Sequence, residues 1–160
     1  MSQLHPYDLR SCLHSCQLLV SGNDVALFTQ GCCFHFVLRL FYERRIGTPY
    51  GSPCTKSDEN GSRLSYHHVW LAVGELSVDV NGVHDRQTFS EDMRTKYDCI
   101  AEAKPETIQR IIDEKRFTPK LLKRVNDRAL WVFDNETRFD PIRRLIADYP
   151  SVDTNRNRAV

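Results

Sequence analysis

The stretch "YHHVWLAVGELSVDVNGV", residues 66–83, decides the class of fold. Apolar residues alternate with other residues on both sides of Gly74-Glu75, and a two-residue interruption of this kind is typical of a turn between antiparallel strands. The apolar face comprises Val69, Leu71 and Val73 in the first run and Leu76, Val78 and Val80 in the second. The stretch therefore predicts a β-hairpin with one face toward the core.

Helical patterns flank this hairpin. From Cys33 onward, apolar residues recur at the i, i+3, i+4 spacing of an amphipathic helix, which we expect to end at Arg44-Arg45 and Gly47. The other segments predict helices at 3–20, 85–97, 105–117, 118–133 and 139–149, a long loop at 47–65 and a third strand at 98–104. We expect an α+β fold, in which helices pack against a small antiparallel sheet.

Length and composition narrow the kind of protein. The 160 residues are enough for one domain with its own core, which we expect over residues 1–150, followed by a flexible tail at 151–160. Hydrophobic residues make up 41% of the chain and charged residues 27%, which is typical of a globular protein and not of a disordered one. The net charge of +1 argues against nucleic acid or a membrane surface as a partner.

The first residues, "MSQLHPYDLR", lack the basic and then apolar pattern of a secretion signal. We therefore expect a cytoplasmic protein, and delivery to another cell stays open by a route that needs no such signal. In the cytoplasm the six cysteines are expected to be reduced thiols. Cys12, His14 and Cys16 form a C-x-H-x-C pattern, but the second ligand pair of a structural zinc site is missing, so we expect neither a metal nor another cofactor.

Three residues have the types and the order that a nucleophilic site requires. Cys33 lies in the first turn of a predicted helix, where the dipole and the free N–H groups favour a thiolate. With a turn at 74–75, His68 pairs with positions 80–82, so that Asp79 and Asn81 flank it on one face of the neighbouring strand. The imidazole would take the thiol proton, the carboxylate would orient the ring, and the backbone N–H of Cys33, with Gln30, would stabilise an oxyanion.

Each of these three assignments has an alternative in the sequence. Cys32 precedes Cys33, which we prefer because it shares the face of the apolar residues of the predicted helix. His67 precedes His68, which we prefer because it points away from the apolar face of the strand. Asp79 stands just before a glycine turn and would also suit a purely local role in that turn.

The pattern G-x-C-x-x-F at a helix, then H-V on a strand, then an aspartate between apolar residues before x-G-V resembles the small papain-like cysteine hydrolases of bacteria, phages and plasmids. The matching residues are Gly31, Cys33, Phe36, His68, Val69, Val78, Asp79, Val80, Gly82 and Val83, and the resemblance covers residues 24–100. It implies a papain-like core, a Cys33-His68-Asp79 triad, and Gln30 and Asn81 as helpers. Gln30 stands closer to the cysteine than the oxyanion glutamine of papain-like proteases does.

The resemblance further implies a thiol-dependent hydrolase or acyl transferase that acts on an amide, isopeptide or thioester bond of a protein or peptide. Proteases, amidases and protein-glutamine deamidases all belong to this class, including effectors of phages and bacteria. The alternative is a catalytically silent binding or inhibitor protein, encoded by a phage or another mobile element, that keeps the papain-like scaffold. The sequence specifies neither the substrate nor the oligomeric state.

Overall fold

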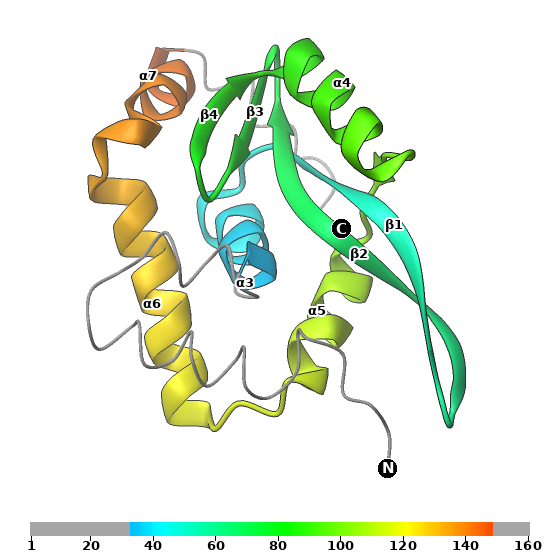
Figure 1. Ribbon diagram of the computed structural model, residues 1–160. Coiled ribbons are helices and arrows are strands. Elements are labelled where there is room, and N and C mark those ends of the chain that lie inside the picture. Colours follow the sequence, from blue (N-terminus) through cyan, green and yellow to red (C-terminus); the bar gives the residue numbers. More distant parts are fainter. Residues whose placement is uncertain (1–32, 149–160) are drawn as a thin grey trace.

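A five-stranded antiparallel sheet with the strand order β4-β3-β2-β1-β5 lies at the centre of the protein (Figure 1). The computed structural model describes residues 33–148. The strands are β1 (Thr48–Asp58), β2 (Gly61–Val73), β3 (Leu76–Asp79), β4 (Gly82–Asp85) and β5 (Ala101–Glu102). The described part of the chain therefore has the predicted α+β class, and the predicted turn at Gly74-Glu75 joins β2 to β3.

Helices cover both faces of this sheet (Figure 1). They are α3 (Cys33–Arg39), the π-helical turn η2 (Leu40–Arg44), α4 (Arg86–Tyr97), α5 (Pro105–Glu114), α6 (Pro119–Asn135), the 3-10 turn η3 (Thr137–Phe139) and α7 (Asp140–Asp148). α3 contacts β2, β3, α5 and α6, whereas α4 contacts β1, β3 and β4 from the other side. The helices predicted between 85 and 148 are all present.

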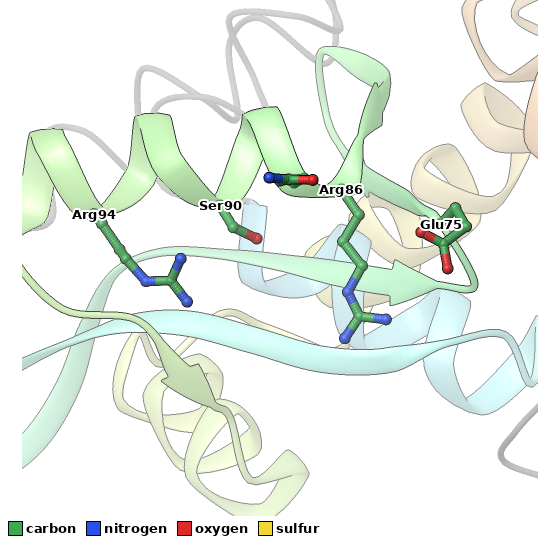
Figure 2. A pocket seen from close by; sticks show the side chains of 5 residues that line it. Glu75, Arg86, Ser90 and Arg94 are labelled. Atoms are coloured by element: carbon green, nitrogen blue, oxygen red, sulfur yellow. The ribbon is translucent and has the colours of Figure 1, made fainter.

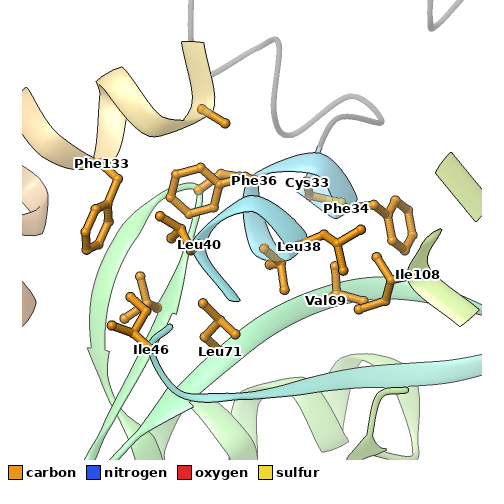
Figure 3. Close-up of a cluster of buried hydrophobic side chains, with 14 of the residues drawn as sticks. Cys33, Phe34, Phe36, Leu38, Leu40, Ile46, Val69, Leu71, Ile108 and Phe133 are labelled. Atoms are coloured by element: carbon orange, nitrogen blue, oxygen red, sulfur yellow. The ribbon is translucent and has the colours of Figure 1, made fainter. Parts of the chain in front are cut away.

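The main core lies between α3 and the sheet (Figure 3). Phe36 and Leu40 of the α3–η2 segment are fully buried, as are Val69 and Leu71 of β2. The helix ends where the sequence predicts, at Arg45, which takes a left-handed conformation with φ of 53°. The amphipathic helix predicted from Cys33 is therefore confirmed, and it buries one continuous apolar face against the hairpin.

The loop predicted for 47–65 is wrong, because most of this segment belongs to the long hairpin of β1 and β2. Its prolines, Pro49 and Pro53, lie on β1, whose outer side pairs only with the two-residue strand β5. Prolines are tolerated at such an edge because few ladder hydrogen bonds are lost. Gly51 is needed for packing, since a Cβ there would come within 2.6 Å of the Tyr66 ring.

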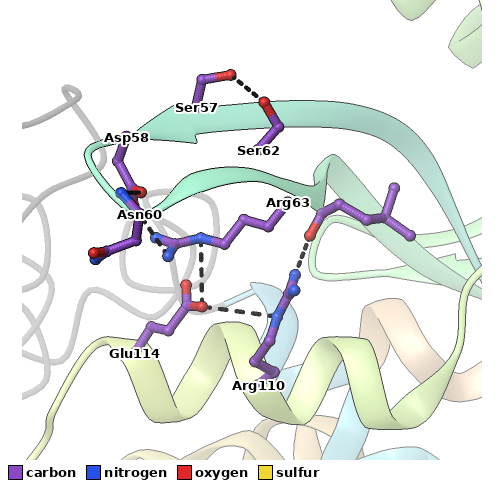
Figure 4. A network of polar contacts seen from close by, with 8 residues as sticks. Ser57, Asp58, Asn60, Ser62, Arg63, Arg110 and Glu114 are labelled. Carbon is purple, nitrogen blue, oxygen red and sulfur yellow. Dashed lines mark hydrogen bonds and ion pairs between the residues drawn. The ribbon is translucent and has the colours of Figure 1, made fainter.

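The tip of this hairpin is tied to α5 by polar contacts (Figure 4). Arg63 of β2 lies 3.0 Å from a carboxylate oxygen of Asp58 and 3.5 Å from one of Glu114. Arg110 of α5 donates to the backbone carbonyl of Leu64. The contacts of Arg63 with Glu114 and of Arg110 with Leu64 join residues far apart in the sequence, which explains why turn-rich composition alone predicted a loop.

The helix predicted at 3–20 and the tail predicted at 151–160 lie outside the described residues, as do Gln30 and Cys32. Residues 98–104, predicted as a strand, contain the short strand β5. None of the helices between 33 and 148 combines the length and the apolar character needed to cross a bilayer.

Candidate active site

Cys33 is the first residue of α3, and its side chain belongs to the core cluster between this helix and the sheet. The residue is 5% exposed, and Figure 3 shows it among the buried side chains of this cluster. The Cys33 thiol lies close enough to His68 of β2 to help raise the pKa of that imidazole. The structure therefore brings together the thiol and the imidazole that the sequence singles out.

A β-bulge in β2 separates the two adjacent histidines. Between two regular pairs of the β1–β2 ladder, Ser52 alone stands opposite both His67 and His68. His67 is exposed and stacks on Tyr97 of α4, with the ring centroids 5.1 Å apart. The His68 side chain is 17% exposed and turns toward Asp79. Bulges redirect side chains in this way next to functional sites, and here His68, but not His67, lies against Asp79.

Asp79, the last residue of β3, uses its two carboxylate oxygens differently. Oδ2 lies 3.0 Å from Nε2 of His68. Oδ1 accepts the backbone N–H of Asn81 at 2.9 Å and lies 2.8 Å from Nε2 of His84. The bond from Asn81 is the kind that closes a turn around an aspartate. Asp79 thus contacts His68 through one oxygen and closes the turn into β4 through the other, so its geometry is compatible with both roles considered for it.

The electrostatics of the site follow from this geometry. Burial on its own lowers the pKa of His68, but the hydrogen bonds and negative charges of Asp79 and Cys33 outweigh it and raise this pKa to about 10. Burial on its own raises the pKa of Asp79, but the hydrogen bonds from His68 and His84 hold it well below its usual range. At neutral pH the central pair is therefore an imidazolium next to a carboxylate, joined by a charge-assisted hydrogen bond.

The orientation of the His68 ring fixes which nitrogen faces which partner. Because Nε2 faces Asp79, Nδ1 is the nitrogen left for the Cys33 thiol. Trp70 supports the ring from β2, with the two centroids 6.0 Å apart. An imidazole held in this way can exchange a proton with the sulfur on one side while the carboxylate keeps its tautomer on the other.

The remaining sequence-based candidates have different outcomes. Asn81 is exposed, and the contact described for it is made by its backbone N–H. Gln30, expected to help stabilise an oxyanion, lies outside the described residues. His84 was missed, although the Asn81-Gly82 pair is a hairpin signal that would have placed it on a strand beside Asp79.

His35, the third residue of α3, is fully buried. Its ring stacks on Phe117 with the centroids 5.3 Å apart, and neither ring nitrogen has a hydrogen-bond partner among the described residues. Burial, helped by the nearby cations of Lys115 and Arg39, holds the pKa of His35 well below 6.5. His35 is therefore a neutral core residue at physiological pH.

A cavity of about 260 Å³ lies along α4 (Figure 2). Its lining comprises Glu75, Arg86, Gln87, Ser90 and Arg94. Arg86 is anchored there by a hydrogen bond of 3.0 Å to the carbonyl of Gly74. None of the three proposed triad residues lines this cavity, so it is distinct from the site around His68.

Within residues 33–148, no group of three or more histidine, cysteine or acidic side chains is arranged to hold a metal ion. The described site brings together the side chains of Cys33, His68 and Asp79. Its chemistry has to be judged from this geometry, because no family model, no curated protein and no solved structure matches the chain.

Proposed function

We propose that the chain is a thiol-dependent hydrolase or acyl transferase that acts on an amide, isopeptide or thioester bond through Cys33, His68 and Asp79. The observation that carries this proposal is the continuous line of contacts from the Cys33 thiol through the His68 imidazole to the Asp79 carboxylate. A nucleophile, a base and a group that orients the base are the three parts that covalent catalysis of this type requires. A papain-like core, and a substrate that is a protein or peptide, belong to the same proposal.

The reaction would proceed through a thioester on Cys33. The thiolate attacks the carbonyl carbon, an S–C bond forms, and the π electron pair of the carbonyl moves onto its oxygen. His68 then gives its Nδ1 proton to the leaving amine or thiol as the carbonyl re-forms and the old bond breaks. The neutral imidazole next takes a proton from water or from an acceptor nucleophile, which attacks the thioester and releases the Cys33 thiolate.

Asp79 would serve throughout as the group that holds His68. Its bond to Nε2 keeps Nδ1 turned toward the sulfur, and its charge stabilises the imidazolium that is present before the first proton transfer and again after the second. The low exposure of the Asp79 side chain, 4%, keeps water from competing for this bond. A fixed carboxylate of this kind lowers the cost of forming the charged pair at neutral pH.

Alkylation by iodoacetamide, followed by mass spectrometry of each cysteine peptide, tests the nucleophile without knowledge of the substrate. Cys33 is 5% exposed and Cys99 is exposed, so accessibility alone predicts faster labelling of Cys99. Activation by His68 reverses this order. At pH 6.5 an ordinary thiol with a pKa of about 8.5 is only about 1% thiolate, and we expect Cys33 to react at least about tenfold faster than Cys99.

Two histidine variants complete the experiment. His68→Ala should slow the labelling of Cys33 below that of Cys99, because the thiolate loses its cationic partner. His67→Ala is the matched control and should leave the rate unchanged, since that ring packs on Tyr97. Equal and slow labelling of all cysteines in the unaltered protein would contradict the proposal and favour a silent binding or inhibitor protein.

A further inference from the structure

Asp79 belongs to a closed circuit of side chains that extends beyond the proposed triad. Its Oδ2 lies 3.0 Å from Nε2 of His68, and its Oδ1 lies 2.8 Å from Nε2 of His84. The His68 ring stacks on Trp70 at 6.0 Å, and Trp70 meets Phe89 edge-on at 5.2 Å. Phe89 in turn stacks on His84, with centroids 4.7 Å apart and planes at 24°. One carboxylate thus holds both ends of a row of four rings, which we call the aromatic circuit.

The members of the aromatic circuit come from four elements. His68 and Trp70 belong to β2, Asp79 to β3, His84 to β4 and Phe89 to α4. Trp70 and Phe89 are 1% and 7% exposed, so close packing fixes their rings. The His84 ring is consequently held from two sides, by a buried aromatic face and by a buried carboxylate.

We infer that His84 is a positioning residue of the proposed site, acting on His68 through Asp79. The inference rests on the proposed function, because it concerns how the base of that site is oriented. His84 and the backbone N–H of Asn81 both occupy Oδ1, which leaves Oδ2 as the oxygen that faces His68. With Oδ1 held twice, the carboxylate cannot rotate about its Cβ–Cγ bond without breaking both contacts. The His68 ring, and with it Nδ1, therefore keeps its direction toward Cys33.

A purely structural role would be that His84 only stabilises the β3–β4 hairpin, where it pairs with Ser77. Two variants separate this role from positioning. His84→Phe keeps a ring against Phe89 but removes the N–H that reaches Asp79. His84→Gln loses the ring but offers an N–H at a similar distance from the backbone. If the N–H that reaches Asp79 matters, His84→Gln should preserve the properties of the site better than His84→Phe. If only the packing of the ring matters, His84→Phe should preserve them better.

Two readouts follow the site itself. The first is the rate at which the Nε2 proton of His68 exchanges with solvent, measured by NMR. The second is the alkylation rate of Cys33. In His84→Phe we expect exchange to become about tenfold faster and alkylation about tenfold slower, the factor that one net hydrogen bond is worth. His84→Gln should stay within about threefold of the unaltered protein on both readouts. His67→Phe, on the exposed side of the bulge, should change neither.

Unchanged exchange and alkylation in His84→Phe would overturn the inference, and a lower melting temperature alone would assign His84 to hairpin stability. If His84→Phe does not fold, His84→Gln is compared with His84→Asn, whose shorter amide cannot reach Asp79; equal proton exchange in these two would also overturn it. Failure of the proposed function has a different signature: Cys33 would label no faster than Cys99 in the unaltered protein. The exchange of the His68 ring proton decides the role of His84 in either case.

Discussion

Replacing Asp79 by asparagine should convert His68 from an imidazolium into a neutral ring near pH 8.5. The substitution keeps the size of the side chain and an oxygen that can accept the N–H of Asn81, but it removes the negative charge beside Nε2. Asp79 provides the largest of the effects that raise the pKa of His68 to about 10, and burial opposes them. Without the carboxylate, burial is opposed by Cys33 alone.

The size of the change can be worked out from the contact. An opposite charge in hydrogen-bond contact moves a pKa by about 1–3 pH units. Burial increases the effect of removing the Asp79 charge, so we expect the pKa of His68 to fall by about 2–3 pH units. That corresponds to about 3–4 kcal/mol of lost preference for the imidazolium. At pH 8.5 the ring is almost fully protonated in the unaltered protein, and it should be largely neutral in Asp79→Asn.

The assay is an NMR titration of the ring nitrogens of the six histidines between pH 5 and 11, where His68 is identified by its absence in His68→Ala. Asp85→Asn is the matched control, because Asp85 is an exposed helix cap bonded to Thr88 and makes no contact with His68. A His68 that still titrates near 10 in Asp79→Asn, or near 6.5 in the unaltered protein, would refute the reasoning.

Three further predictions can be checked independently. Cys33→Ala should abolish fast alkylation and any thioester formation while the circular dichroism spectrum is kept, whereas Cys32→Ala should be much milder; the reverse result would move the nucleophile by one residue. His35 resists protonation in the folded state but not in the unfolded state, so stability should fall by up to about 1.4 kcal/mol per pH unit as pH drops below 6.5; urea unfolding at pH 5 and 8 should show that His35→Phe removes this loss. Gly51→Ala should lower stability by about 1–3 kcal/mol, because its Cβ would meet the Tyr66 ring at 2.6 Å; an unchanged unfolding midpoint would show that the ring moves aside freely.

The parts of the fold that could be predicted from sequence are those with local signals. The hairpin has its own turn at Gly74-Glu75 and the helix from Cys33 has a visible period, so both elements could be predicted, although β2 begins at Gly61 and not at residue 66. The β1 strand has no such signal. Its identity comes from pairing with β2 and from the contacts of the hairpin tip with α5, which join residues far apart in the chain.

The site shows the same division. The proximity of His68 and Asp79 could be predicted because a two-residue turn fixes the register of the strands on either side. Regular alternation favoured His68 over His67. In the structure, a bulge is what turns the two side chains in different directions, and no pattern of residues in the sequence predicts this bulge. The contact of His84 with Asp79 could be predicted only if Asn81-Gly82 is interpreted as a second hairpin turn, because that turn places β4 beside β3 and Asp79.

The bulge also has a consequence for how this protein can vary. Tyr66 and Val69 are three positions apart in β2, yet both are buried in the same core cluster, so the inner and outer halves of the strand are out of step by one residue. An insertion of one residue in β1 beside Ser52 would bring the halves back into step. The outer half of the hairpin would then present its opposite side to α5. Arg63 would point away from Glu114, and the salt bridge between them would be lost. A change of length beside Ser52 therefore decides which side of the outer hairpin faces α5.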